Sequence, residues 1–306
     1  MTSQVSRHPA EIKMTSIVTL KVTDGLVLAA DSAATFYVST AGGPVTKIYN
    51  NANKIFNLRK VWSIGALAYG AGGIGASSVE TLSKDLRQRF CDKKDTAYFL
   101  EKDSYTVEEV AIKARRFIYE QSFLTSFGDA PPADFQMGYR VCGYSAKADQ
   151  PEIWEFFIKG GECTPPYRVQ AQDEFGLRWA GETEALDRLI LGTTTAILGW
   201  LVNKGFIQPE NANATHTELI NHFAAPLSLP AMPIQDAIEV ARFAVDTAAK
   251  YAKYGMRPET IGGPIELAAI TKHEGFRWVA RKHYYSAEFN RETDHGRGEN
   301  EGPRSV

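Results

Sequence analysis

A threonine directly after a methionine opens the stretch of this chain that is richest in possible chemistry. Residues 14–35 read MTSIVTLKVTDGLVLAADSAAT, in which Thr15 precedes two β-rich runs separated by Asp24-Gly25. A threonine hydroxyl is a weak nucleophile at neutral pH, but the α-amine of an N-terminal threonine has a pKa of about 7.7–8.0 and can serve as its base. If Thr15 becomes the first residue, base and nucleophile therefore lie on one residue. An ordinary edge hairpin is the alternative interpretation.

Such a nucleophile needs an orienting acid and a cation nearby, and the chain offers Asp31 and Lys54. With a turn at Asp24-Gly25, Asp31 pairs with Val18, roughly 10 Å along the strand from Thr15. Strand alternation then places Asp31 and Thr15 on opposite faces, so a bulge or bend at the first residues is needed. Lys54 opens an apolar run and is a candidate for partial burial. The alternative is an exposed lysine whose stem covers apolar surface.

A run of glycines, Gly70 to Gly75, follows the next β-rich segment. Its GxGxxG spacing after a predicted strand and before a predicted helix is the context of a dinucleotide site. The segment after the helix is polar and broken instead of a buried strand ending in an acid, which disfavours a nicotinamide enzyme. The run is otherwise a tight strand-to-helix turn, or a set of backbone N–H groups that hold an oxyanion.

Hydrophobic periodicity predicts the elements that must position these residues. Strands are expected at 16–22, 26–31, 54–58, 61–68, 137–144, 152–159, 264–271 and 275–281. Helices are expected around 79–90 and 107–118, and at 183–204 and 234–251. Strands and helix pairs come in groups, which argues against a parallel doubly wound sheet. We therefore expect an α+β protein with two stacked antiparallel sheets flanked by helix pairs.

One large domain is the default for a chain of 306 residues. We expect an N-terminal extension or propeptide at 1–14 and a single domain at 15–285. The Pro- and Asn-rich segment at about 206–233 is expected to be an insertion in that domain. The polar, charged residues 286–306 are expected to be a disordered tail.

Composition excludes several classes of partner. A net charge of −2 gives no electrostatic footprint for nucleic acid or an anionic membrane. Three cysteines without a CxxC pair argue against a disulfide framework or a zinc site and fit a reducing cytoplasm. The chain has no apolar run of about 18 residues and no secretory signal at its start. The six histidines lack metal-ligand spacing, so no metal or cofactor is expected.

Several of these features occur together in one known family. Residues 15–82 resemble the start of a bacterial-type proteasome β subunit, a member of the N-terminal-nucleophile (Ntn) hydrolases, and the likeness extends over most of 15–282. The resemblance implies a four-layer αββα sandwich (the Ntn hydrolase fold) and threonine-dependent hydrolysis of amide or peptide bonds. The matched stretches are Thr15-Ser16-Ile17-Val18, Asp24 to Ser32, Lys54-Ile55-Phe56, the glycines at 70–75, and Thr260 to Thr271.

By the same resemblance, Thr15 is the nucleophile, Asp31 and Lys54 tune it, and a backbone N–H at Gly70 or Gly72 holds the oxyanion. It also implies a cytoplasmic threonine protease that assembles with itself into a homo-oligomeric ring and acts on peptides or proteins. An ATPase partner is left open. The alternatives are a non-catalytic structural subunit of a proteasome-like assembly and a small-molecule amidohydrolase of the same superfamily.

Supporting positions differ from the family pattern. Ala180-Gly181-Glu182-Thr183 stands where the family has Gly-Ser-Gly, and Pro258 and Ile261 replace a later acid and serine. Met14 replaces the glycine that precedes the threonine in members that cleave themselves. We therefore expect Thr15 to become free through translation from Met14 and removal of that methionine, with a form that starts at Met1 existing beside it as the alternative.

Overall fold

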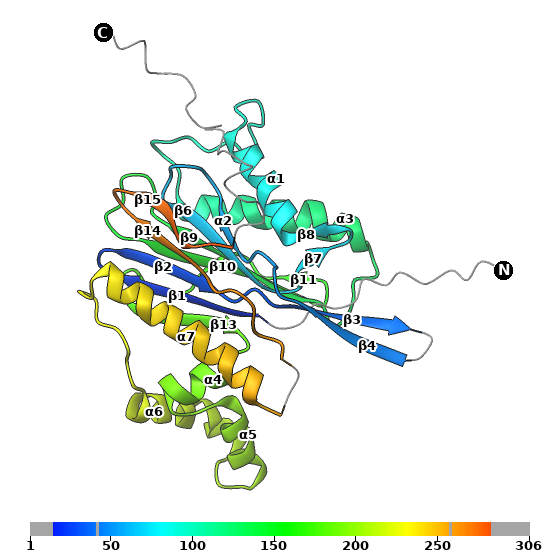
Figure 1. Ribbon diagram of the computed structural model, residues 1–306, viewed down its shortest axis with the longest axis vertical. Coiled ribbons are helices and arrows are strands. Elements are labelled where there is room, and N and C mark those ends of the chain that lie inside the picture. The colour runs from blue at the N-terminus through cyan, green and yellow to red at the C-terminus, as the bar shows by residue number, and fades with distance from the viewer. Residues whose placement is uncertain (1–14, 41–42, 257–258, 283–306) are drawn as a thin grey trace, which may run out of the picture.

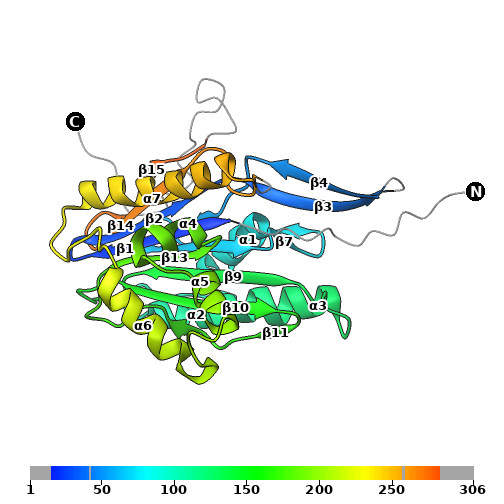
Figure 2. The ribbon, with the colours of Figure 1, turned by 90° about the horizontal axis from the view of Figure 1, so that it is seen from below.

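The protein, seen in a computed structural model, is a mixed α+β structure (Figure 1). The residues described are 15–40, 43–256 and 259–282, so the predicted extension at 1–14 and the whole of the predicted tail lie outside them. Within that part the strands form four antiparallel sheets, two large and two of only two strands, and none is closed. The two large sheets pack face to face (Figure 2).

The first large sheet has five strands. Two of them, β1 and β2, are buried along their whole length because the sheet is covered on both faces. The continuously apolar sequence of β2 suits that position, whereas β1 also buries the polar residues Ser16, Thr19 and Lys21. The strands lie in the order β13 (Gly176–Gly181), β1 (Ser16–Val22), β2 (Gly25–Ala30), β14 (Glu266–Thr271) and β15 (Gly275–Ala280).

The second large sheet packs its inner face on the first. Leu28 and Ile270 of the first sheet and Leu67 and Cys142 of the second are fully buried in the cluster between them. Burying each such leucine or isoleucine contributes roughly 1.5–3 kcal/mol, so this cluster holds the sheets together. The strands lie in the order β11 (Glu162–Cys163), β10 (Glu152–Lys159), β9 (Gln136–Gly143), β6 (Ile64–Gly70) and β5 (Ile55–Asn57), and β12 (Tyr167–Arg168) also pairs with β10.

Helices cover the outer face of the second sheet. Helix α1 (Val79–Cys91) buries Leu82, Leu86 and Phe90, which recur at helical spacing, and Ser78 caps its first turn by accepting the Thr81 N–H. The next helical stretch packs beside it in the same core cluster. It consists of α2 (Val107–Arg115), the π-helical η1 (Arg116–Phe123) and α3 (Leu124–Phe127).

The outer face of the first sheet is covered by one long helix, α7 (Ile234–Tyr254), which lies along β1 and β2 (Figure 1). Its buried stripe consists largely of alanines, including Ala237, Ala241, Ala244 and Ala248. Small side chains let the helix axis approach the sheet closely.

The predicted four-layer αββα sandwich, with a helix pair on each side, is wrong. Among the described residues, no second long helix lies beside α7 on the outer face of the first sheet, because the helix predicted at 183–204 is broken. It forms α4 (Glu184–Leu186), η2 (Asp187–Leu191) and α5 (Thr195–Asn203), with a bend of 85° before α5. The left-handed Gly192 ends η2, with a φ of +69°.

The segment after this break does not form a helical layer either. The predicted insertion contains η3 (Pro209–Asn211) and α6 (Ala212–Phe223), and neither α5 nor α6 has a buried residue. They lie at one end of the molecule, beyond α7 and α4 (Figure 1). The structure is therefore better described as α+β with several open antiparallel sheets.

Two hairpins that we did not predict flank the region of Thr15. Strands β3 (Ala34–Thr40) and β4 (Gly43–Tyr49) pair only with each other and project from the body of the protein (Figure 2). Strands β7 (Gly73–Ile74) and β8 (Ser77–Ser78) form a short ribbon between β6 and α1.

Within the ranges described, each helix taken alone is too short or too polar to span a bilayer. One bent pair, Glu184–Leu191 with Thr195–Asn203, meets the length and composition criteria when its two parts are taken together.

Candidate active site

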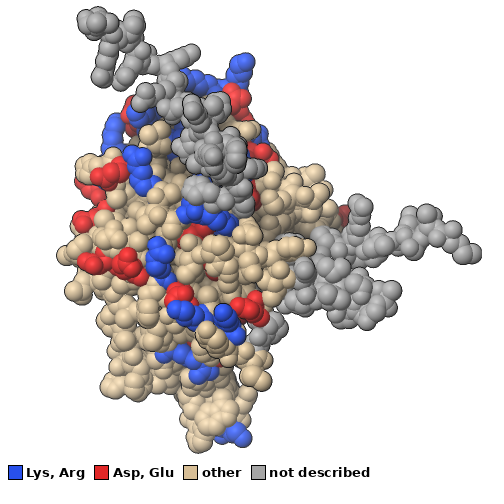
Figure 3. All heavy atoms as spheres, in the orientation of Figure 1, with Lys and Arg blue, Asp and Glu red and all other residues tan. Residues whose placement is uncertain are grey.

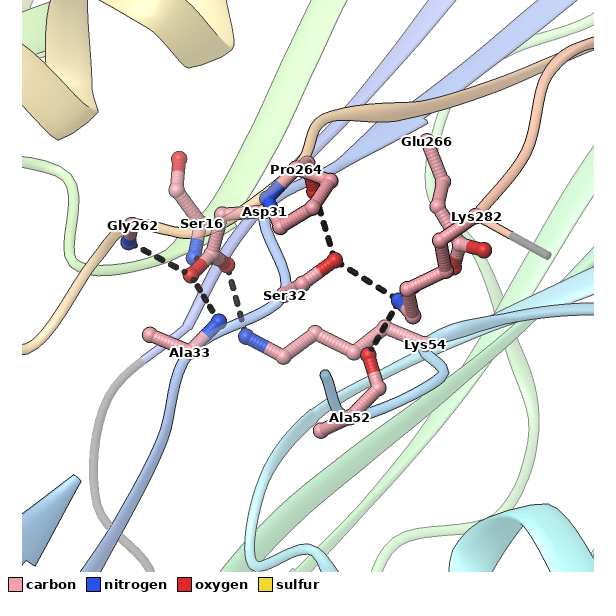
Figure 4. Close-up of polar contacts among 10 residues, drawn as sticks. All are labelled: Ser16, Asp31, Ser32, Ala33, Ala52, Lys54, Gly262, Pro264, Glu266 and Lys282. Atoms are coloured by element: carbon pink, nitrogen blue, oxygen red, sulfur yellow. Dashed lines mark hydrogen bonds and ion pairs between the residues drawn. The ribbon is translucent and has the colours of Figure 1, made fainter. Parts of the chain in front are cut away.

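Asp31 is the most completely bonded side chain near Thr15. Its carboxylate is fully buried and accepts four hydrogen bonds (Figure 4). Oδ1 accepts from the Ser16 N–H at 3.0 Å and from Lys54 Nζ at 2.6 Å. Oδ2 accepts from the Ala33 N–H at 3.0 Å and the Gly262 N–H at 3.1 Å. A carboxylate with this many donors is fixed in one orientation.

The register of the first hairpin differs from the prediction. Val22 pairs with Gly25, so the turn is at Thr23-Asp24, one residue earlier than predicted, and each residue of β2 pairs two positions further toward the N-terminus of β1. Asp31 consequently lies beside Ser16, and its N–H donates to the Ser16 carbonyl at 3.3 Å, instead of beside Val18.

This register removes the need for a bulge. Strand β1 begins at Ser16 and β2 ends at Ala30, so Thr15 and Asp31 both lie just beyond the regular pairing. The alternation of the pleat therefore does not decide on which side their side chains lie.

Lys54 lies immediately before β5 and is buried, with a side-chain exposure of 7%. Burial lowers the pKa of its ammonium below the usual 10.5, and the Asp31 carboxylate opposes that shift. The nearby Lys282 lowers the pKa further and Glu266 raises it. Lys54 is thus a buried cation whose charge depends on its neighbours, as a group that tunes a nucleophile must be.

Thr15 lies at the wall of a small pocket. The pocket has about 90 Å³ of space for solvent, and Lys54, Gly70 and Gly72 line it together with Thr15. Thr15 itself is 3% exposed, and its carbonyl accepts the Glu182 N–H at 2.9 Å. Four of the five predicted site residues therefore meet at one pocket, and the fifth, Asp31, lies beneath it bonded to Lys54.

The glycine segment is built differently from a dinucleotide site. Strand β6 is antiparallel to both of its neighbours, and the β7–β8 ribbon separates it from α1. A dinucleotide site instead needs a parallel strand that leads directly into a helix.

The same segment narrows the choice of oxyanion donor. The Ala71 N–H donates to the Gln136 carbonyl at 2.7 Å and is therefore taken. Gly70 has a φ of +84°, and a Cβ there would lie 2.3 Å from the same carbonyl, so only glycine fits. Gly70 and Gly72 stay predictions as oxyanion donors.

The residues at the supporting positions that depart from the family pattern differ in their surroundings. The Glu182 N–H holds the Thr15 carbonyl through the hydrogen bond above, and Gly181 lies against the same carbonyl. Ile261 is 1% exposed and packs in an apolar cluster with Ala185 and Ala248. Pro258 lies outside the described residues.

The glycine at 181 is expected to be essential for placing Thr15. Its φ is +92°, and a Cβ there would lie 1.7 Å from the Thr15 carbonyl oxygen. Gly205 is a matched control, because its φ is +75° and a Cβ would meet nothing within 4 Å. Gly205→Ala should cost only the conformational strain of about 1–2 kcal/mol, and Gly181→Ala about 3 kcal/mol or more. Urea unfolding measures the loss of unfolding free energy in both variants. Equal losses would show that the close approach of Gly181 to the Thr15 carbonyl does not affect stability.

Three groups near the site were not assigned a role from the sequence. Gly262 bonds Asp31, and Glu266 and Lys282 form an ion pair behind Ser32. The signal for Glu266 is a single acid in an otherwise apolar predicted strand, which is uncommon unless the charge is paired. Lys282 carries no comparable signal, because it follows the last strand in a polar stretch.

Nothing among the described residues forms a group of three or more His, Cys, Asp or Glu side chains that could hold a metal ion. The polar side chains that line the pocket include the Thr15 hydroxyl, the Lys54 ammonium and the Glu80 carboxylate, beside those of Asn53, Tyr69 and Ser78. Those groups suit proton transfer and nucleophilic attack.

Comparisons with known proteins give only distant similarity. No family model matches the sequence, and no curated protein matches it. Among solved structures, the helical assembly of the Anbu complex from Pseudomonas aeruginosa is similar, at 15% identity over 88% of each chain, with a TM-score of 0.47. The Anbu (Gly-1) mutant from Hyphomicrobium sp. strain MC1 is similar at 12% identity over 88% of this chain and 86% of that one, with a TM-score of 0.48.

These findings correct the family assignment made from the sequence. The similar structures are Anbu complexes, no family model supports a bacterial-type proteasome β subunit of the Ntn hydrolase superfamily, and the predicted sandwich is not formed. At these identities and TM-scores the similarity carries no argument about activity, which must come from the pocket itself.

Proposed function

We propose that the protein is an amide hydrolase whose nucleophile is Thr15, exposed as the first residue either by translation from Met14 and removal of that methionine or by removal of residues 1–14. One observation carries the proposal. Thr15, the buried cation Lys54 and two glycines line the same pocket, and Asp31 holds Lys54 from beneath at 2.6 Å. The substrate class that suits an alcohol nucleophile with an adjacent amine base is an amide, with a peptide as the expected example.

The reaction proceeds by acyl transfer. The Thr15 hydroxyl oxygen attacks the amide carbon while its proton passes to the Thr15 α-amine. A backbone N–H at Gly70 or Gly72 stabilises the oxyanion. The intermediate collapses, the amine product leaves with the proton from the α-ammonium, and an ester on Thr15 remains. Water activated by the same α-amine then hydrolyses that ester and restores the hydroxyl.

Asp31 and Lys54 act by electrostatics. The Lys54 cation lowers the proton affinity of the groups at the pocket, since like charges disfavour another positive charge nearby. Asp31 keeps Lys54 in place and offsets its buried charge. The uncut chain is expected to be inactive, because the amide nitrogen of Thr15 is not basic.

A direct test compares a chain that begins at residue 15 with the full chain. Both are incubated with a mixture of unstructured peptides and, separately, with small amides, and products are identified by mass spectrometry. Cleavage of peptides by the shorter chain alone supports the proposal. Cleavage of small amides alone would point to a small-molecule amidohydrolase. No product from either substrate set would contradict amide hydrolysis.

A second candidate function, a non-catalytic subunit of an assembly, is favoured by one surface. Trp200 and Phe206 in and after α5 and Phe223 in α6 are 54%, 69% and 56% exposed. The end of the molecule that carries them has few charges in Figure 3. Exposed large apolar side chains of this kind mark interaction sites, and a second copy of the chain is the proposed occupant.

Self-association through this surface predicts a measurable dissociation. Trp200→Lys with Phe206→Lys should raise the dissociation constant at least about tenfold, because buried aromatic anchors dominate interfaces. Ile112→Lys, which changes a 52% exposed side chain on α2, should not. Sedimentation velocity over a range of concentrations measures the effect. A wild-type chain that stays monomeric throughout would exclude the assembly candidate.

A further inference from the structure

A second ion pair is buried behind the Asp31–Lys54 pair. Lys282, two residues after β15, lies 3.0 Å from Glu266 of β14, and their side chains are 7% and 1% exposed (Figure 4). Glu266 Oε1 has no hydrogen-bond partner among the described residues. Burying two charges is costly unless they are well compensated, so a pair at this position calls for an explanation beyond stability.

Lys282 also ties together the two segments that carry Asp31 and Lys54. Its ammonium donates to Ser32 Oγ at 2.7 Å and to the Ala52 carbonyl at 2.7 Å. Ser32 directly follows Asp31, and Ala52 lies two residues before Lys54. The Ala52 N–H donates in turn to the Ser32 carbonyl at 2.9 Å. The lysine thus fixes the spacing of the two backbones whose side chains form the first ion pair.

Ser32 is held on its far side as well. Its hydroxyl donates to the Pro264 carbonyl at 2.5 Å, and its N–H donates to the Gly262 carbonyl at 2.9 Å. The Gly262 N–H bonds Asp31 at 3.1 Å. Backbone groups of the loop before β14 therefore position Asp31 and Ser32, and the Lys282 ammonium holds Ser32 as well.

We propose that Lys282 and Glu266 are positioning residues that hold the Asp31–Lys54 pair in place and set the charge of Lys54 beside Thr15. The catalytic part of this proposal rests on the function proposed above. Its electrostatic part concerns the folded chain alone and does not need a free Thr15.

The charges around Lys54 balance. Asp31 and Glu266 are the carboxylates that face the two ammonium groups, and Glu80 adds a weaker contribution at Lys282. Burial lowers the pKa of Lys282 as it does that of Lys54, and Glu266 opposes it. Removing one member of the Lys282–Glu266 pair therefore leaves a net charge close to Lys54, and removing both does not.

Charge removal gives opposite expectations for the two single variants. Lys282→Met leaves an extra negative charge and should raise the pKa of Lys54 by about one unit. Glu266→Gln leaves an extra positive charge and should lower it by about one unit. Lys282→Met with Glu266→Gln should bring it back near the wild-type value. A purely structural role would not reverse sign between the two variants.

The Lys54 titration can be followed in the full chain. The protein is labelled with lysine carrying ¹³C at Cε, and the Lys54 signal is identified by its loss in Lys54→Arg. Its chemical shift is measured as a function of pH in the wild type and the three variants. The matched control is the exposed pair of Lys250 and Asp246 on α7, which are 64% and 42% exposed. Lys250→Met should leave the titration unchanged.

A second readout separates this inference from the proposed function. In a chain that begins at Thr15, the pH midpoint of labelling by an epoxyketone should move in the same directions as the Lys54 pKa. If the wild-type chain is not labelled but Lys54 titrates as expected, the hydrolase proposal fails and the electrostatic role stands. If neither single variant moves the Lys54 titration, the inference is overturned whatever the labelling result.

Discussion

Thr15→Ala in a chain that begins at residue 15 is expected to lower peptide hydrolysis by at least about a thousandfold. The substitution removes the only atom proposed to attack the amide, and loss of a nucleophile typically removes nearly all covalent catalysis. The fold should be unaffected, because the Thr15 contact that holds the segment is its backbone carbonyl with the Glu182 N–H. Initial rates of peptide cleavage measure the effect, and an unfolding curve like that of the wild type shows that the variant is folded.

Two neighbouring substitutions make this result specific. Thr15→Ser keeps a hydroxyl and should retain substantial activity. Ser16→Ala removes a hydroxyl one residue away that is buried and has no hydrogen-bond partner in the described structure. That change should leave the rate within about threefold, because no polar contact is lost. If Thr15→Ala keeps more than a tenth of the wild-type rate, another group is the nucleophile.

Asp31→Ala is expected to lower the free energy of unfolding by about 3–5 kcal/mol. The variant leaves Lys54 as a buried cation without its partner, and loss of one member of a buried pair costs about that much. It also leaves the N–H groups of Ser16, Ala33 and Gly262 without their acceptor. Hydrolysis should fall together with stability, since Lys54 is released from its position at the pocket.

An exposed aspartate provides the control for Asp31. Asp246 pairs with Lys250 at 2.6 Å on the surface of α7, and exposed pairs contribute at most about 1 kcal/mol. Asp246→Ala should therefore change the free energy of unfolding by less than about 1 kcal/mol. Urea denaturation of both variants at pH 7 gives the comparison. A loss below about 1 kcal/mol for Asp31→Ala would mean that the carboxylate is not the centre of the site.

The strands around Thr15 were predictable because their sequences alternate or are continuously apolar. The segments predicted at 16–22 and 26–31 correspond to β1 and β2, and those predicted at 137–144 and 152–159 to β9 and β10. Their register was not predictable. Asp24-Gly25 is a strong turn signal by itself, but the observed Val22–Gly25 pairing places the turn at Thr23-Asp24.

The overall arrangement was predicted less well because it depends on local breaks. The apolar run at 183–204 has helical periodicity, and periodicity alone does not reveal the left-handed Gly192 or the cap that Thr194 gives to α5. Those two features bend the chain, so the long helix predicted at 183–204 does not form beside the sheet. The resemblance to a family then extended one correct local pattern to an architecture that the chain does not adopt.

The candidate site was predictable only where one residue type has a distinct chemical role. Thr15, Asp31 and Lys54 were chosen as nucleophile, acid and cation, and they lie together in the structure. Lys282 is 228 positions after Lys54 and reaches the site only because β15 pairs with β14. A contact of that kind follows from sheet topology, and no local pattern in the sequence indicates it.

The most direct test of the central claim is the mass of the protein after treatment with a peptide epoxyketone, which reacts with a hydroxyl and a free α-amine on the same residue. The natively expressed protein is first examined by intact mass and N-terminal sequencing, and then labelled and digested. The expected result is a chain that begins at Thr15 and carries one adduct on the peptide that contains it, with no adduct on Thr15→Ala. A chain that begins at Thr15 and takes up no adduct, or one that always retains residues 1–14, would contradict the proposal that Thr15 is the nucleophile.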